Sequence, residues 1–137
     1  MNDIILNKKA AIERCIRQIG RYYALDSDLP FEADYLRQDA IAMNLQRACE
    51  LAIDIANHLI KSKRLGLPQD SRDSFGLLQQ AGLISIAQMK NLQAMVGFRN
   101  TLVHQYREIN LAIMVDVIEH HLPEMLDFAN TALEAAG

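Results

Sequence analysis

The chain has 137 residues, of which half are apolar, and its formal net charge is −3 at pH 7. A chain of this length can bury the core of one domain without disulfides or metal ions, and its apolar content argues against intrinsic disorder. The negative charge excludes a protein that coats duplex nucleic acid through a basic surface, and no apolar run approaches the ~20 residues of a membrane span.

The first helix is predicted from about Asp3 to Tyr23. Its apolar stripe consists of Ile5, Ile12, Ile16 and Ile19. Charged residues interrupt this stripe, so the N-terminus is not a signal peptide and we expect the protein in the cytosol.

The abundance of Ala, Leu and Ile and the few Gly and Pro predict an all-α fold, an antiparallel bundle of about five helices in a single domain spanning residues 1–137.

The second helix, from about Ala33 to Arg64, is the longest and is apolar over most of its circumference. A helix of this kind must be covered on several sides, so we expect a homodimer formed by helix packing. Its polar residues share one narrow stripe, formed by Arg47, Glu50, Asp54, Asn57, His58 and Lys61. The stripe is interpreted as a solvated face with ion pairs one turn apart, and the alternative is a seam that lines an active cleft.

The sequence carries no metal or cofactor motif. Glu50, Asp54 and His58 share a face of the second helix, but two carboxylates and one histidine often do so by chance. Cys15 and Cys49 lie in different helices and form no C-x-x-C pair, so we interpret both as small core residues. We therefore expect an activity that requires neither a metal nor a cofactor.

The third helix is predicted from about Ser71 to Ala81. The fourth begins after Ser85 as its N-cap, and its apolar stripe consists of Met89, Leu92, Val96 and Val103. The fifth begins after Asn110 and continues to the C-terminus with a bend near Pro123. In this helix His120 lies four residues from both Asp116 and Glu124, which predicts surface pairing, and neither His120 nor His121 is expected to be catalytic.

Reactive side chains gather at the end of the fourth helix, in the stretch FRNTLVHQYREIN. On a continuous helix Arg99 shares the apolar stripe with Tyr106, and a buried guanidinium is costly unless an anion or a carboxylate meets it. His104 lies roughly 140° around the helix from Arg99, so either the helix loosens near His104 or two subunits combine their residues. The structural alternative is a buried arginine paired to an acid, with a histidine and a tyrosine that cap the helix C-terminus.

The segment RNTLVHQY, with Arg99, His104 and Tyr106, resembles the R-x4-H-x-Y signature of HEPN domains. The length of the chain and its long second helix, LQRACELAIDIANHLI, also resemble the HepT toxins of type VII HEPN/MNT toxin–antitoxin systems. The resemblance implies a dimerising helical bundle and a metal-independent endoribonuclease. It also implies a partner, an MntA-like nucleotidyltransferase antitoxin, which silences the toxin by adenylylating the motif tyrosine, here Tyr106.

This chemistry agrees with the residues. Cleaving RNA without a metal requires a base for the 2′-hydroxyl and an acid for the leaving 5′-oxygen, and histidine serves both purposes near neutral pH. We therefore predict His104 as the acid–base residue, Arg99 as the phosphate-binding residue and Asn100 in support. AMP on Tyr106 would occupy the phosphate site beside Arg99.

The acidic chain fits a small or structured RNA, such as a tRNA end, better than a general RNA substrate. Two rival hypotheses remain open. One is a non-catalytic helical partner that presents substrate to a nucleotidyltransferase, and the other is a purely structural dimerisation module. Loss of RNA cleavage in a folded His104→Ala variant would separate the enzyme from both.

Overall fold

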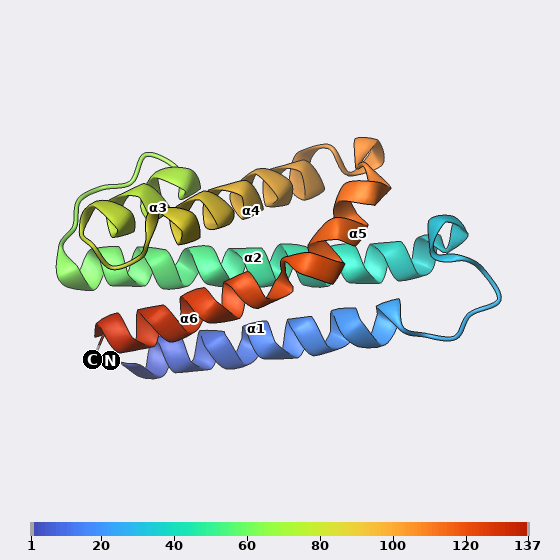
Figure 1. The fold of residues 1–137 in the computed structure, drawn as a ribbon, viewed down its shortest axis with the longest axis horizontal. Helices are drawn as coiled ribbons and strands as arrows, with labels where there is room; N and C mark the ends of the chain where they lie inside the picture. The colour runs from blue at the N-terminus through green and yellow to red at the C-terminus, as the bar shows by residue number, and fades with distance from the viewer. Residues whose placement is uncertain (1, 137) are drawn as a thin grey trace.

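The computed structural model describes residues 2–136, and this part of the chain contains six α-helices, two short 3-10 helices and no strand (Figure 1). The α-helices are α1 (Asn2–Tyr23), α2 (Tyr35–Lys63), α3 (Ser71–Gln80), α4 (Ile86–His104), α5 (Leu111–His120) and α6 (Leu122–Ala136). The 3-10 helices are η1 (Phe31–Ala33) and η2 (Tyr106–Glu108). The all-α prediction is confirmed. No helix in residues 2–136 is long and apolar enough to span a membrane.

The predicted fifth helix is in fact two helices, α5 and α6. The backbone leaves helical geometry at His121, where φ is −120° and ψ is −8°. Pro123 lies in the first turn of α6, where its missing N–H would have no partner within the helix in any case. The chain therefore turns just before the proline, and α5 crosses from the end of α4 to the start of α6 (Figure 1).

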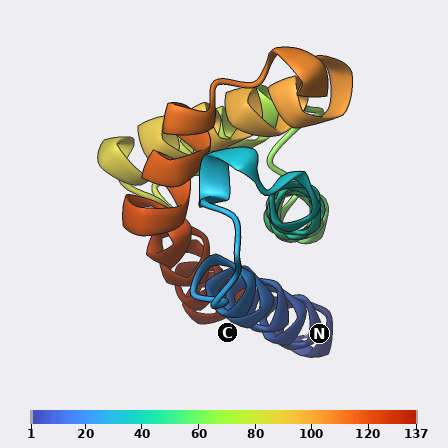
Figure 2. The same ribbon diagram turned by 90° about the vertical axis from the view of Figure 1, so that its right-hand side faces the viewer.

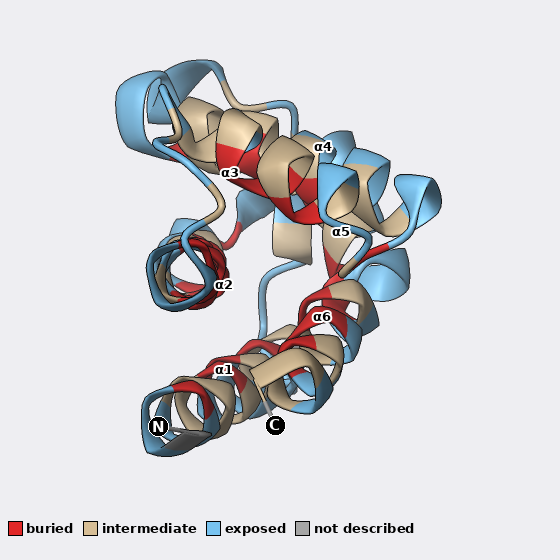
Figure 3. Ribbon diagram, turned by 90° about the vertical axis from the view of Figure 1, so that its left-hand side faces the viewer, coloured by how far each residue is buried: buried red, intermediate tan, exposed pale blue. Residues whose placement is uncertain are grey.

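Helix α2 is the central helix of the bundle and contacts α1, α3, α4 and α6. In Figure 1, α6 lies beside α1 on one side of α2, and α3 and α4 lie on the other side. Figure 2 shows the same arrangement nearly along the axis of α2. The buried sides of α1, α2, α4 and α6 face one another (Figure 3). One subunit thus covers most of α2, so its apolar circumference does not by itself require a second subunit.

Several local predictions are confirmed. Ser85 caps α4 in a reciprocal capping box with Gln88, whose backbone N–H donates to the Ser85 hydroxyl at 3.0 Å. Asn110 caps α5 by accepting from the Ala112 N–H at 2.9 Å. Cys15 and Cys49 are free and buried in the core. These features depend on residues within one turn or on an apolar face, so sequence alone can reveal them.

The start of α2 is anchored by Arg37, a buried residue that the sequence analysis did not identify. Its Nε donates to Oδ2 of Asp34 at 2.8 Å, and its Nη1 donates to the carbonyl of Tyr23 at 3.1 Å. Its Nη2 donates to the carbonyl of Leu29 at 3.3 Å. These bonds join the end of α1, the following loop and the first turn of α2, and they hold this end of α2 in place.

Candidate active site

The motif lies where α4 ends. His104 is the last residue of α4, and Gln105 leaves helical geometry with φ −138° and ψ 37° before Tyr106 begins η2. Of the two alternatives that the spacing left open, the first, a helix that loosens near His104, is therefore observed. The predicted place of Tyr106 on the same helical stripe as Arg99 is wrong, because the helical register stops two residues before the tyrosine.

The apolar stripe of α4 also differs near its end. Leu92 and Val96 are buried as predicted, but Val103 is 41% exposed. Leu102 is buried in its place, at 5% exposure. The buried face of α4 therefore shifts by about one residue position as the helix approaches the motif, which leaves Val103 and His104 at the surface.

Arg99 is half-buried and directed toward the start of α3. Its Nη2 donates to the hydroxyl of Ser71 at 3.2 Å, whereas its buried Nε has no hydrogen-bond partner in the described part of the chain. Within residues 2–136 no carboxylate forms an ion pair with Arg99. The structural alternative, a buried arginine paired to an acid, is therefore wrong for the part of the chain that the structure describes. A guanidinium left with unused donors is suited to an anion such as a phosphate.

Arg99 sits at the junction of α2, α3 and α4. Its positive charge acts on the Cys49 thiol of α2. Burial raises the pKa of this thiol to about 12, and the charge of Arg99 opposes that rise. On the same side of the bundle the Ser74 hydroxyl of α3 donates to Oδ1 of Asn57 on α2 at 2.7 Å. Asn100 is half-buried and His104 is exposed, so the imidazole is open to a substrate or to a second subunit.

Tyr106 contacts a residue that sequence reasoning missed. Its hydroxyl donates a hydrogen bond to Oδ1 of Asp39 on α2. Burial of the ring, together with the hydrogen bond and the negative charge of Asp39, raises the pKa of Tyr106 well above its ordinary value. The chain around the tyrosine, residues 103–108, is exposed. Asp39 is an exposed acid on a helix 67 residues earlier in the chain, so no local pattern could have singled it out.

The polar stripe of α2 is a largely exposed face, as the sequence predicted, although its ion pair differs from the expected one. Asp54 pairs with Lys8 of α1 at 3.5 Å rather than with a residue one turn away on α2. Asp39 and Asn57 are about five helical turns apart, so they project from the same edge of α2, with Glu50 between them. At one end of this edge Asp39 contacts Tyr106 of the motif, and at the other end Asn57 contacts Ser74 of α3. Within residues 2–136 no three His, Cys, Asp or Glu side chains are grouped to hold a metal ion.

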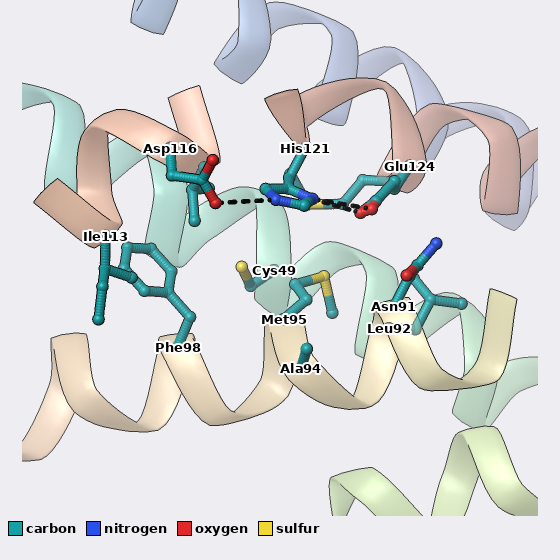
Figure 4. Close-up of a pocket in the computed structure, with 12 residues that line it drawn as sticks. Cys49, Asn91, Leu92, Ala94, Met95, Phe98, Ile113, Asp116, His121 and Glu124 are labelled. Atoms are coloured by element: carbon teal, nitrogen blue, oxygen red, sulfur yellow. Dashed lines mark hydrogen bonds and ion pairs between the residues drawn. The ribbon is translucent and has the colours of Figure 1, made fainter. Parts of the chain in front are cut away.

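A separate cavity of about 220 Å³ lies between α4 and the α5–α6 corner (Figure 4). Its lining is mainly apolar and includes Met95 and Phe98, and none of Arg99, His104 and Tyr106 contributes to it. At its rim His121 lies between Asp116 at 3.0 Å and Glu124 at 2.8 Å. The prediction that His120 makes these pairs is wrong, because the helix breaks at His121 and turns the neighbouring imidazole toward both carboxylates.

His121 gives a pH-dependent contribution to stability. Its hydrogen bond to Glu124, with a smaller contribution from Asp116, raises its pKa above the ordinary 6.5 despite partial burial. Stabilisation by the protonated ring is therefore full below about pH 6.5 and is lost as the pH rises through the folded-state value. We expect His121→Gln to lower the free energy of unfolding by under about 1 kcal/mol at acidic pH and by less at alkaline pH, because the pair is half-exposed. Urea unfolding at about pH 5.5 and about pH 8.5 measures the difference, and an equal or larger loss at the higher pH would contradict it.

Comparison with known proteins agrees with this geometry. A family model described as ribonuclease HepT-like matches residues 12–132. The mRNA nuclease HepT of Shewanella oneidensis is 51% identical over 128 residues, which cover 93% of this chain and 95% of that protein.

Two solved structures are also similar over the whole chain. One is the tri-AMPylated HEPN toxin of Shewanella oneidensis in complex with MNT antitoxin, with a TM-score of 0.89, 48% identity and complete coverage of both chains. The other is a toxin–antitoxin complex with AMP-PNP, with a TM-score of 0.89 and 47% identity, covering 99% of this chain and 100% of that chain. The family match, the identity and the placement of the R-x4-H-x-Y residues at the end of α4 agree, and the chain belongs to the HepT-like ribonuclease family of HEPN-domain proteins.

Proposed function

We propose that Arg99 and His104 are the catalytic residues of a metal-independent endoribonuclease, the toxin of a HEPN/MNT toxin–antitoxin pair that acts in the cytosol. The observation that carries this proposal is the state of Arg99, whose buried Nε is unpartnered and which has no carboxylate to neutralise it in residues 2–136. In a chain of the HepT-like ribonuclease family, an unneutralised guanidinium five residues before an exposed histidine is suited to an RNA phosphate.

The residues divide the reaction between them. Arg99 binds the phosphate and stabilises the charge that develops on it, and Asn100 supports this contact. One His104 takes the proton of the 2′-hydroxyl as the 2′-oxygen bonds to phosphorus, and the bond from phosphorus to the 5′-oxygen breaks. A second His104 from a partner subunit protonates the leaving 5′-oxygen. The products are a 2′,3′-cyclic phosphate and a 5′-hydroxyl.

A homodimer would supply the second histidine. Exposed apolar side chains are found on the two helices that meet at this end of the molecule, with Met43 of α2 55% exposed and Val103 of α4 41% exposed. The start of α2 and the end of α4 lie at the same end of the bundle (Figure 1). Burial of these side chains against a second subunit would place two motifs side by side. Sedimentation as a monomer at concentrations at which the protein cleaves RNA would contradict the shared site.

The direct test is cleavage of messenger RNA and tRNA by the purified, unmodified protein in EDTA. We expect fragments that end in 2′,3′-cyclic phosphate, whereas fragments with only 3′-hydroxyl ends would rule out this route. The intact mass of the sample must first show that the protein carries no adenylyl group. No cleavage by unmodified protein would instead favour the non-catalytic partner of a nucleotidyltransferase.

Tyr106 is the proposed target of the antitoxin. It lies on an exposed segment, and an adenylyl group on its hydroxyl would bring a negative phosphate to the site where Arg99 binds RNA. We expect co-expression with the cognate MntA-like nucleotidyltransferase to raise the intact mass by whole adenylyl units, and we expect Tyr106→Phe to abolish this increase. Tyr35→Phe is the matched control, because Tyr35 is also exposed, at 72%. Adenylylation that persists in Tyr106→Phe would show that the target is another residue.

A further inference from the structure

The fold brings a carboxylate against the oxygen that the proposed modification uses. The Tyr106 hydroxyl donates to Oδ1 of Asp39, in the second turn of α2. Asp39 is exposed and Tyr106 is 36% exposed, so the active site of a partner protein can reach both groups. Arg37, two residues before Asp39, anchors this end of α2 through its bonds to Asp34 and to the loop carbonyls. The Asp39 carboxylate therefore lies on the anchored end of α2, whereas Tyr106 lies on the exposed segment of residues 103–108.

The tyrosine needs a base if it is to act as a nucleophile. Burial of the ring and the contact with Asp39 raise the pKa of Tyr106, so the hydroxyl stays protonated near neutral pH. A neutral hydroxyl is a weak nucleophile and is activated when a neighbouring base takes its proton during the attack. Such a base must lie within hydrogen-bond reach of the proton, and Asp39 already accepts that hydrogen bond.

We propose that Asp39 is a catalytic residue for the adenylylation of Tyr106, contributed by the modified protein itself. Asp39 takes the phenolic proton as the Tyr106 oxygen forms a bond to the α-phosphorus of a nucleoside triphosphate bound by the antitoxin. The bond between this phosphorus and the bridging oxygen breaks, and pyrophosphate leaves. The inference rests on the proposed function, because it requires Tyr106 to be the modified residue.

The product cannot keep the contact that made it. After transfer the Tyr106 oxygen has no proton to donate, and the phosphodiester attached to it is negatively charged. Asp39 would then face a like charge, which is unfavourable at short range. The hydrogen bond from Tyr106 to Asp39 of α2 is therefore lost on modification.

The experiment measures initial rates of AMP incorporation into purified, unmodified protein, with ATP and the cognate nucleotidyltransferase at saturating concentrations. The variants are Asp39→Asn, which keeps the shape but not the base, and Asp39→Glu, which keeps a carboxylate. Glu32→Gln is the matched control, because it removes one exposed negative charge from η1, just before α2. Tyr106→Phe reports on the target itself.

We expect Asp39→Asn to lower the saturated rate about 10²-fold or more near neutral pH, the contribution typical of a general base. Asp39→Glu should keep a larger share of the rate than Asp39→Asn, and Glu32→Gln should match the wild type. The rate of Asp39→Asn should recover as the pH rises, because an ionised phenol needs no base. A residue that only docks the antitoxin would alter the concentration needed for saturation and would show no such recovery.

Two failures are distinguishable. If Tyr106→Phe is inert but Asp39→Asn is modified at the wild-type rate, or loses rate without recovery at high pH, the role of Asp39 is overturned while the proposed function stands. If the wild type is not modified, or Tyr106→Phe still is, the proposed function and the role of Asp39 are overturned together.

Discussion

His104→Ala is expected to lower RNA cleavage in EDTA by about 10²–10⁴-fold, the contribution typical of a general acid–base group. The expected loss is at the upper end of this range if two His104 side chains serve one site, because the substitution removes both the base and the acid. His104 is exposed and is the last residue of α4, so its truncation leaves the core intact. The free energy of unfolding should change by no more than about 0.5 kcal/mol.

The control for this variant is His120→Ala, which removes an exposed histidine from the last residue of α5. We expect it to cleave RNA at the wild-type rate. The measurement is the single-turnover rate on a defined RNA, with urea unfolding of both variants in parallel. A His104→Ala variant that is folded and cleaves normally would show that another group carries the proton transfers.

Arg99→Met is expected to lower cleavage by about 10²–10³-fold, the loss typical when one donor to a developing negative charge is removed. Unlike most substitutions of a partly buried arginine, it should cost little stability. Among the residues that the structure describes, the wild-type side chain has one hydrogen bond, to Ser71, and its buried Nε has no partner. Replacement by methionine loses the hydrogen bond to Ser71, which lowers stability, but it also removes the unsatisfied Nε, which raises stability. The two effects oppose each other, and no carboxylate is left unpaired.

Arg37→Met provides the contrast. Arg37 is buried, is paired to Asp34 and bonds to several carbonyls, so its replacement should cost about 3–5 kcal/mol, as is usual when a buried pair loses one partner. Urea unfolding of the two variants, beside the single-turnover cleavage rate of Arg99→Met, tests both statements. If Arg99→Met were as destabilised as Arg37→Met, the arginine of the motif would be a structural residue. Arg99→Lys should recover little cleavage, because a lysine lacks the fork that binds two phosphate oxygens.

Much of the fold could be predicted because the signals are local. The caps at Ser85 and Asn110 involve residues within one turn, and the apolar faces of α1 and α2 recur at helical spacing. The bend predicted near Pro123 is a complete break at His121, two residues earlier, because proline is compatible with the first turn of a new helix and the chain turns just before it. Arg37 was missed because its partners are backbone carbonyls in the preceding loop, which leave no mark in the sequence.

The sequence by itself determined the helical class, the spacing of Arg99, His104 and Tyr106, and the family that this spacing indicates, because these depend on residue types and short intervals along the chain. Only the tertiary structure decided what each of these side chains meets. Arg99 meets a serine of α3 instead of an acid, and Tyr106 meets Asp39. The physical reason is that these contacts join residues 28 and 67 positions apart, and they depend on how α2, α3 and α4 pack and on where α4 ends.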